Sequence, residues 1–156
     1  MSREACDEER RFPLFVPCKG KTVTVVGGGA VAARRIGTLA KFPFAVRVIA
    51  PAACADILRR AEAGELQLVR AAYDGSGLAD SFFVLACTND DACNRRVVRD
   101  CRAQGIPVNS CSCAADCDFY FPAVITRGPL TAALAGDGSD HAAVRAAADT
   151  IREALR

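Results

Sequence analysis

The chain has 156 residues, 51% hydrophobic and 24% charged, which is the size and composition of one globular domain with a small appendage. Its net charge of +2 comes from basic residues dispersed among acidic ones, so nothing marks nucleic acid as a partner. No stretch approaches the ~20 apolar residues of a membrane span. The charged start MSREACDEERR lacks the apolar core of a secretory signal, which predicts a cytoplasmic protein.

The first predicted elements flank a run of three glycines. Residues 22–26 form an apolar, β-branched run that is typical of a buried parallel strand. After the glycines at 27–29 the apolar period changes to about 3.6, which predicts a helix with Val31, Ile36 and Leu39 on its apolar side. Further strands are predicted at 45–50, 66–69, 82–86 and 106–109, and further helices at 52–63 and 90–104, the last capped by Thr88 or Asn89.

Strands that alternate with helices predict right-handed crossovers and a parallel sheet with helices on both faces. We therefore expect residues 1–112 to form a Rossmann-like, doubly wound α/β domain. After it, two short strand-like runs surround the turn at 127–129, and a helix is predicted at 141–156. One hairpin and one helix bury too little to stand alone. Residues 113–156 should lean on the Rossmann-like domain or, as we favour, form the dimerisation region of a homodimer.

The glycine run fits the pattern G-x-G-x-x-A, with Gly27 and Gly29 as its glycines and Ala32 as its alanine. Gly27 is expected to allow a tight turn, Gly29 to let a pyrophosphate approach the backbone, and Ala32 to let the helix pack closely on the strand. The helix dipole and the first-turn amides would then face the phosphates. This pattern between a strand and a helix predicts a dinucleotide site; a merely tight turn is the alternative.

The acidic residue expected at the end of the second strand is missing, because the sequence there reads Ile49-Ala50-Pro51-Ala52. The usual mark that separates NAD from NADP is therefore absent. In a Rossmann arrangement the nicotinamide lies beyond the carboxyl ends of the later strands. That logic places Cys87, Thr88 and residues 109–112 near the reacting ring.

Several segments, taken in order, resemble one family over roughly residues 12–155. They are the FPLF lead-in, VVGGGAVAARR, VIAP, ACTNDDACNRRV, GIPVN and CDFYFPAVITRGPLTAAL, followed by the closing helix. This ordered set resembles the siroheme synthase N-terminal domain family, whose members act as precorrin-2 dehydrogenase and sirohydrochlorin ferrochelatase. The resemblance implies an NAD-dependent oxidoreductase of siroheme (porphyrin) biosynthesis that oxidises precorrin-2 to sirohydrochlorin, works as a homodimer and, in many members, inserts Fe(II).

The resemblance also implies roles for individual residues. By position, the glycine loop would line the pyrophosphate and adenosine site, Pro51 and Ala52 would border the adenine, and Cys87 and Thr88 the nicotinamide. Asn109 would sit at the mouth of the cleft for the tetrapyrrole substrate, and Ser112 would share that site. The loop residues assigned in this way are Gly27, Gly28, Gly29, Ala30 and Val31.

Three features depart from the family pattern. The aspartate that the family commonly carries after N-V-V or N-V-A is Ser112 here, a poor general base and a weak iron ligand. The family segment S-[ST]-x-G-x-S-P is represented by the altered run at 135–141. Members usually continue into a further helical domain, whereas this sequence ends at Arg156. We expect dehydrogenation to survive these changes better than chelation, since a bound nicotinamide needs chiefly positioning.

The chain carries nine cysteines, three of them close together at Cys111, Cys113 and Cys117. Thiolates suit zinc, Cu(I) and iron–sulfur centres, although a structural zinc site normally needs four ligands. The simpler interpretation is small residues tolerated in a loop, as we expect for the cysteines inside apolar or helical patterns at 54, 87 and 101. His141, at the start of the last helix, is a possible ligand or general acid but is more typical of a surface residue.

Two other functions remain open from the sequence. One is a non-catalytic tetrapyrrole carrier or partner protein that keeps the cleft without the catalytic aspartate. The other is a cysteine-based metal or redox sensor on a Rossmann scaffold.

Overall fold

The computed structural model describes residues 11–138 and 140–155 of the chain. The described residues form two compact units: Cys18–Phe119, and residues 120–138 and 140–155 together with 11–17. The division between Phe119 and Tyr120 falls seven residues after the sequence-based boundary between 112 and 113, and the domain boundary stays a prediction. The charged start over 1–10, with Cys6, lies outside the described residues, so its interpretation also stays a prediction.

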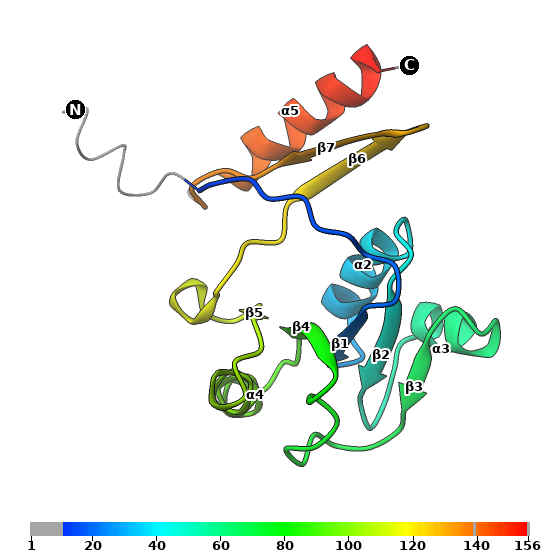
Figure 1. The fold of residues 1–156 in the computed structure, drawn as a ribbon, viewed down its shortest axis with the longest axis vertical. Coiled ribbons are helices and arrows are strands. Elements are labelled where there is room, and N and C mark those ends of the chain that lie inside the picture. The colour runs from blue at the N-terminus through cyan, green and yellow to red at the C-terminus, as the bar shows by residue number, and fades with distance from the viewer. Residues whose placement is uncertain (1–10, 139, 156) are drawn as a thin grey trace. The chain divides into compact units, whose positions relative to one another are not determined.

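The larger unit contains a five-stranded parallel sheet in the order β3-β2-β1-β4-β5 (Figure 1). Because the strand order reverses between β1 and β4, right-handed crossovers carry α2 and α4 to opposite faces of the sheet. The doubly wound prediction is confirmed. The strands are β1 (Thr22–Val26), β2 (Ala45–Ile49), β3 (Gln67–Val69), β4 (Ser81–Ala86) and β5 (Val108–Ser110), and the helices are α2 (Ala30–Leu39), α3 (Ala55–Glu62) and α4 (Asp91–Ala103).

Local sequence explains most of these elements. Four of the five residues of β1 are buried, as expected for a strand covered on both faces. The N-cap of α4 was predicted wrongly as Thr88 or Asn89; it is Asp90. The Asp90 carboxylate accepts hydrogen bonds from the amides of Ala92 (2.8 Å) and Cys93 (3.2 Å). A negatively charged carboxylate at this position also interacts favourably with the positive end of the helix dipole.

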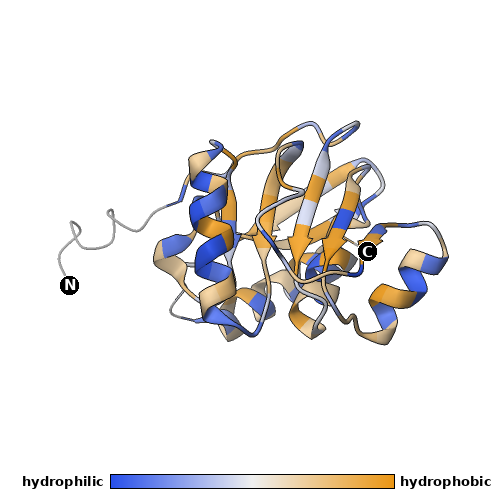
Figure 2. Cartoon of the chain, turned by 90° about the horizontal axis from the view of Figure 1, so that it is seen from below, coloured by the Kyte–Doolittle hydropathy of each residue, from blue (hydrophilic) through white to orange (hydrophobic). Residues whose placement is uncertain are grey.

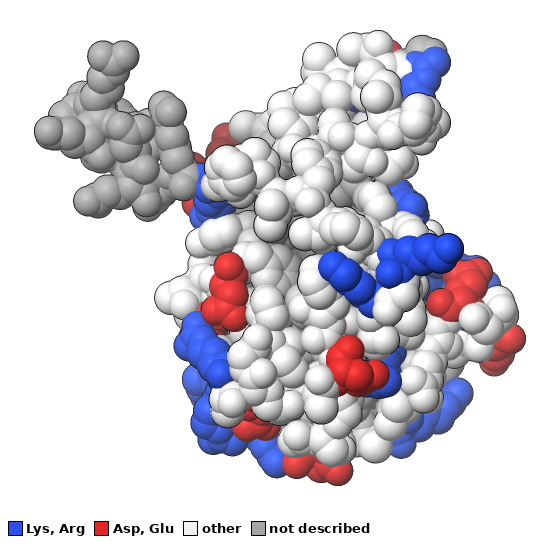
Figure 3. All heavy atoms as spheres, viewed as in Figure 1, with Lys and Arg blue, Asp and Glu red and all other residues white. Residues whose placement is uncertain are grey.

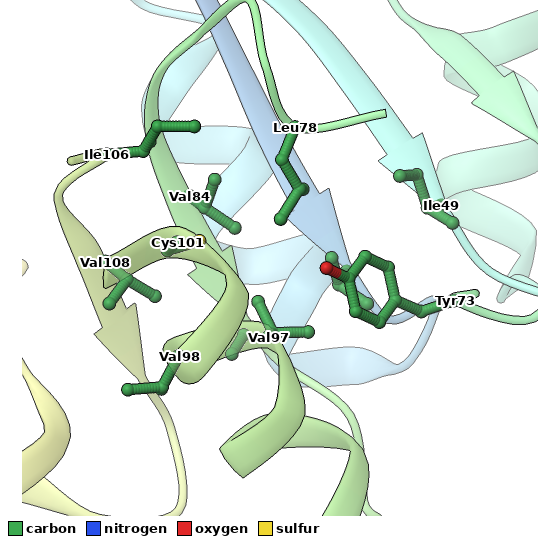
Figure 4. Close-up of a cluster of buried hydrophobic side chains, with 11 residues drawn as sticks. Ile49, Tyr73, Leu78, Val84, Val97, Val98, Cys101, Ile106 and Val108 are labelled. Carbon is green, nitrogen blue, oxygen red and sulfur yellow. The ribbon is translucent and has the colours of Figure 1, made fainter. Parts of the chain in front are cut away.

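The α4 face of the sheet is covered partly by a helix and partly by an irregular segment. Val97, Val98 and Cys101 of α4 pack in one buried cluster with residues of β4 and β5. The 70–80 connection contains no helix, but its Tyr73 and Leu78 join the same cluster (Figure 4). The Tyr73 hydroxyl donates to the Asp100 carboxylate at 3.0 Å, which fastens this connection to α4. The core therefore fixes the β3–β4 crossover without a second helix on that side.

The smaller unit is an antiparallel hairpin with one helix. Strands β6 (Ala123–Arg127) and β7 (Leu130–Leu134) pair through the predicted turn, where Gly128 adopts φ 51°, and α5 (His141–Ala154) packs on β6. Asp140 caps α5, and His141 is exposed. The Arg11 guanidinium donates to the Gly136 carbonyl and to the Asp137 carbonyl, so the lead-in belongs to this unit. The apolar side chains of the lead-in face solvent: Phe12 is 89% exposed, Leu14 76% and Phe15 65%.

Hydrophobic and charged residues are distributed over this chain as in an ordinary globular protein. The strands are mostly hydrophobic, whereas the helices combine hydrophobic and hydrophilic residues (Figure 2). Acidic and basic side chains are intermixed over the face drawn in Figure 3. Within residues 11–138 and 140–155, no helix combines the length and the apolar character needed to cross a membrane.

Candidate functional site

The glycine turn lies at the point where the strand order of the sheet reverses. Gly27 follows β1, adopts φ 122° and donates its amide to the Ile49 carbonyl at 2.9 Å. A Cβ at this position would stand 2.6 Å from the carbonyl carbon of Cys87 at the end of β4. Since that neighbour is backbone, only glycine lets β1 and β4 approach so closely. This switch point is where open α/β sheets bind their ligands.

Gly28 fastens the turn to the loop that follows β2. Its carbonyl accepts a hydrogen bond from the Cys54 amide at 2.8 Å, and a Cβ would stand 2.8 Å from the Cα of Ala53. Pro51 and Ala52, the residues assigned to the adenine side, are exposed in this loop. The close packing therefore brings the glycine turn and the predicted adenine border to the same edge of the sheet.

Gly29 is the N-cap of α2 and has open space where a Cβ would be. No side chain caps the helix, and the first helical hydrogen bond runs from the Ala33 amide to the Gly29 carbonyl at 3.0 Å. The earlier first-turn amides thus point out of the helix end, which is the arrangement that binds phosphate. Ala32 is completely buried, as the close-packing prediction requires. These residues fit the pyrophosphate of a dinucleotide.

Val31 differs from its prediction as an apolar-face residue of the helix, because it is 41% exposed. It lies in the first turn of α2, beside the open space at Gly29. The core side of the helix is supplied by Ala32, Ile36 and Leu39 instead. An exposed apolar side chain at this place can contact a bound ligand, in agreement with the assignment of Val31 to the cofactor site by resemblance.

A buried amide organises the ends of β4 and β5, and sequence reasoning missed it. Asn94 of α4 is completely buried. Its side-chain oxygen accepts from the Thr88 amide (3.1 Å) and hydroxyl (2.8 Å), and its nitrogen donates to the Thr88 carbonyl (3.0 Å) and to Ser112 Oγ (3.2 Å). The sequence contained a signal for this role. Asn94 lies on the same helical stripe as Val97, Val98 and Cys101, and a polar residue on an apolar stripe needs hydrogen-bond partners when it is buried.

Asn109 and Ser112, the predicted substrate residues, have different environments. Asn109 is 3% exposed, and its side chain donates to the Phe119 carbonyl at 2.6 Å and accepts from the Arg35 guanidinium. Ser112 is exposed, and its hydroxyl pairs with Ser110 Oγ at 3.1 Å as well as with Asn94. Asn109 therefore anchors β5 to α2, whereas Ser112 is the member of the pair that solvent reaches.

The cysteines group differently from their order in the sequence. Cys111 Sγ lies 3.1 Å from Cys87 Sγ, across the ends of two strands. Cys117 instead bonds to the Ser110 backbone, with its sulfur 3.2 Å from both the amide and the carbonyl, and burial raises its pKa. In the part of the chain that the structure describes, no three His, Cys, Asp or Glu side chains are grouped so that they could hold a metal ion.

The residues that directly follow β2, Ala50 to Ala52, carry no charge that could pair with a ribose or its phosphate. Arg47 of β2 forms a bidentate ion pair with Asp80, at 2.6 and 2.8 Å, and also donates to the Gly77 carbonyl. The pair raises the pKa of the arginine, with the hydrogen bond as the main cause. Arg47 is thus engaged in fastening the β3–β4 connection.

A cavity of about 270 Å³ lies at the other end of α2, lined by Ile36, Ala40, Phe42, Phe44, Val46, Arg60, Glu65 and Leu66.

Comparison with known proteins agrees with this geometry. A family model described as "Putative NAD(P)-binding" matches residues 14–123. The "Probable multifunctional siroheme biosynthesis protein HemA" of Ruminiclostridium josui is 33% identical over 144 residues, which are 92% of this chain and 28% of that protein. A siroheme synthase of Photorhabdus laumondii is 34% identical over 144 residues, 92% of this chain and 30% of its own length. The chain thus spans less than a third of these curated relatives.

A solved structure shares the fold. SirC, a precorrin-2 dehydrogenase, superposes with a TM-score of 0.76 at 29% sequence identity, over 94% of this chain and 72% of SirC. The family model covers most of the chain, including the whole glycine turn and both strands beside it. The chain belongs to the siroheme synthase N-terminal precorrin-2 dehydrogenase/NAD-binding domain family.

Proposed function

We propose that the protein is an NAD-dependent precorrin-2 dehydrogenase that converts precorrin-2 to sirohydrochlorin. The observation that carries the proposal is the glycine turn at the switch point, where Gly27 meets Cys87 and Gly29 faces open space at an uncapped helix end. Likeness to SirC over 94% of the chain supports the choice of tetrapyrrole as substrate. The choice of NAD over NADP rests on the family resemblance.

The chain's own residues would bind and orient the cofactor. The amides of Ala30 and Val31 at the start of α2 would hold the pyrophosphate, and Pro51 and Ala52 would border the adenine. A nicotinamide held in this way would supply the hydride acceptor for oxidation of the tetrapyrrole. Thr88 would border the ring, and its backbone is held on both sides by Asn94. Hydride transfer depends on such positioning more than on a titrating side chain.

Chelation of iron is not part of the proposed activity. Ser112 stands where the family carries the aspartate, and its hydroxyl is bonded to Asn94 and Ser110. Neither partner can take up a proton at neutral pH, so neither can activate the hydroxyl as a base. Removal of the pyrrole protons and capture of Fe(II) would both lack the carboxylate that the family uses.

An anaerobic assay tests both statements. The purified chain is incubated with precorrin-2 and NAD, and sirohydrochlorin is followed by its absorbance; Fe(II) is then added to detect siroheme. We expect sirohydrochlorin from the wild type and siroheme only from Ser112→Asp, with Ser112→Ala as the matched control. Tight binding of sirohydrochlorin without turnover would overturn the dehydrogenase in favour of the carrier.

The homodimer belongs to the same proposal. Phe12, Leu14 and Phe15 of the smaller unit are all more than half exposed, which is unusual for three apolar side chains within four residues. Burying them against a second copy would remove this surface from water. The cytoplasmic location stays a prediction from the sequence.

A further inference from the structure

Cys87 and Cys111 are partners across two neighbouring strands. The register of β4 and β5 pairs Ala86 with Ser110, the last residues of the two strands, and each cysteine directly follows its strand. The Cys111 amide donates to the Ala86 carbonyl at 2.9 Å, which holds the two strand ends together at this point. Adjacent strands stand about 4.8 Å apart, within the Cα separation that a disulfide tolerates.

The two sulfur atoms are already close. Their separation is 3.1 Å, so the formation of a bond of about 2.05 Å needs a relative movement of only about 1 Å. Cys87 is 5% exposed, whereas Cys111 is exposed. A reagent from solvent therefore meets Cys111 first, and Cys87 is the thiol positioned behind it.

The surroundings give the two thiols opposite properties. The Cys87 thiol hydrogen-bonds to the Cys111 sulfur, and together with the positive charges of Arg35 and Arg34 it lowers the pKa of Cys111 to about 7 against the opposing effect of burial. The same hydrogen bond, followed by burial, raises the pKa of Cys87. Cys111 is thus the thiol of the pair that ionises first and acts as the nucleophile, and Cys87 is the neutral donor.

Cys101, Cys113 and Cys117 lack this combination. Cys101 is completely buried, and burial raises its pKa to about 12. Cys117 is tied to the Ser110 backbone, and its pKa is also raised. Cys113 is exposed and lies only two residues from Cys111, and its bond to a cysteine is one that its backbone carbonyl accepts from Cys117 Sγ at 3.4 Å. Cys113 is therefore the matched control for Cys111.

We propose that Cys87 and Cys111 form a peroxide-reactive thiol pair at the carboxyl edge of the sheet, with Cys111 as the attacking and Cys87 as the resolving cysteine. The Cys111 thiolate attacks the hydroperoxide; an S–O bond forms, the O–O bond breaks, and an alcohol or water leaves. The Cys87 thiol then attacks the sulfenic sulfur, an S–S bond forms, and the sulfenic hydroxyl leaves as water with the Cys87 proton. One hydroperoxide is reduced by two electrons, and the dithiol is oxidised to a disulfide.

This pair differs from the cysteine group that the sequence suggested, because Cys111 is joined to Cys87 rather than to Cys113 and Cys117. The inference stands without the proposed dehydrogenase activity. Its readout is the covalent state of the chain, so a chain without turnover would still test it.

The experiment uses the full-length, reduced chain with one equivalent of hydrogen peroxide, followed by N-ethylmaleimide and peptide mass mapping. Trypsin separates the partners, since Arg95, Arg96, Arg99 and Arg102 lie between them. We expect a disulfide that joins peptide 71–95 to peptide 103–127 through Cys87 and Cys111. At pH 7 we also expect Cys111 to be alkylated about threefold faster than an ordinary thiol, because its larger thiolate fraction outweighs its lower nucleophilicity.

Three variants complete the test. Cys111→Ser should abolish the disulfide, Cys87→Ser should leave a sulfenic acid at Cys111 that dimedone traps, and Cys113→Ser should behave as wild type. Circular dichroism establishes that each variant is folded, and Cys87→Ala replaces Cys87→Ser if the latter is not. A first disulfide between Cys111 and Cys113 or Cys117, or a Cys87–Cys111 bond that forms equally in unfolded chain, would overturn the proposal.

Discussion

Replacement of Gly29 by alanine should separate cofactor binding from stability. The added methyl group would enter open space, at φ −86° and ψ −172°, a conformation that alanine adopts freely. The poorer capping by alanine and its lower unfolded-state entropy nearly cancel, so the free energy of unfolding should change by less than about 0.5 kcal/mol. The same methyl group would occupy the space beside the first-turn amides, where the pyrophosphate must approach. We expect NAD affinity to fall at least about tenfold, or about 1.4 kcal/mol.

Gly27→Ala is the matched comparison, because its methyl group meets protein rather than solvent. At φ 122° an alanine is strained by about 1–3 kcal/mol, and its Cβ would stand 2.6 Å from the Cys87 carbonyl carbon. Relief requires the ends of β1 and β4 to separate, so a total loss of about 3 kcal/mol is expected. For a chain of this size that loss lowers the melting temperature by roughly 6–12 °C.

The two variants are compared by calorimetric titration with NAD and by thermal unfolding followed by circular dichroism. The expected pattern is a folded Gly29→Ala with weak binding and a less stable Gly27→Ala. A Gly29→Ala chain that melts like wild type and binds NAD with unchanged affinity would refute the placement of the pyrophosphate. A Gly27→Ala chain of unchanged stability would refute the argument from the close approach to Cys87.

Asn94→Ala should lower the free energy of unfolding by about 2–4 kcal/mol in urea titrations, because it removes a completely buried amide and leaves the backbone amide and carbonyl of the half-buried Thr88 without this partner. A loss below about 1 kcal/mol would contradict this. Burial raises the pKa of Cys101 to about 12, so above the ordinary thiol pKa the unfolded chain releases a proton that the folded chain keeps. The free energy of unfolding should therefore fall as the pH rises from about 9 towards 12, by up to about 1.4 kcal/mol per pH unit. Cys101→Ala should remove that part of the decline. Equal slopes of unfolding free energy against pH in the wild type and the variant would count against this reasoning. Phe15→Glu should convert the proposed homodimer to a monomer in light scattering, and a persistent dimer would exclude Phe15 from the interface.

Much of the fold could be predicted because its signals are local. The β-branched run at 22–26 is a strand with the predicted bounds, and the glycines after it lead directly into α2. Element ends moved by one to three residues where capping decides them, as at α3, predicted from 52 and found from Ala55. Val31 was misplaced because helical period alone does not distinguish a core-facing first turn from one that faces a ligand site.

The sequence by itself determined the alternation of strands and helices, the glycine turn and the family, because each depends on neighbouring residues or on an ordered set of motifs. Only the tertiary structure decided which side chains meet at the carboxyl edge of the sheet. It brought Asn94 to Thr88 and Ser112, buried Asn109, and paired Cys111 with Cys87 across 24 positions of sequence rather than with its near neighbours. These contacts follow from the order and register of β4 and β5, which the packing of the whole sheet sets and no local pattern contains.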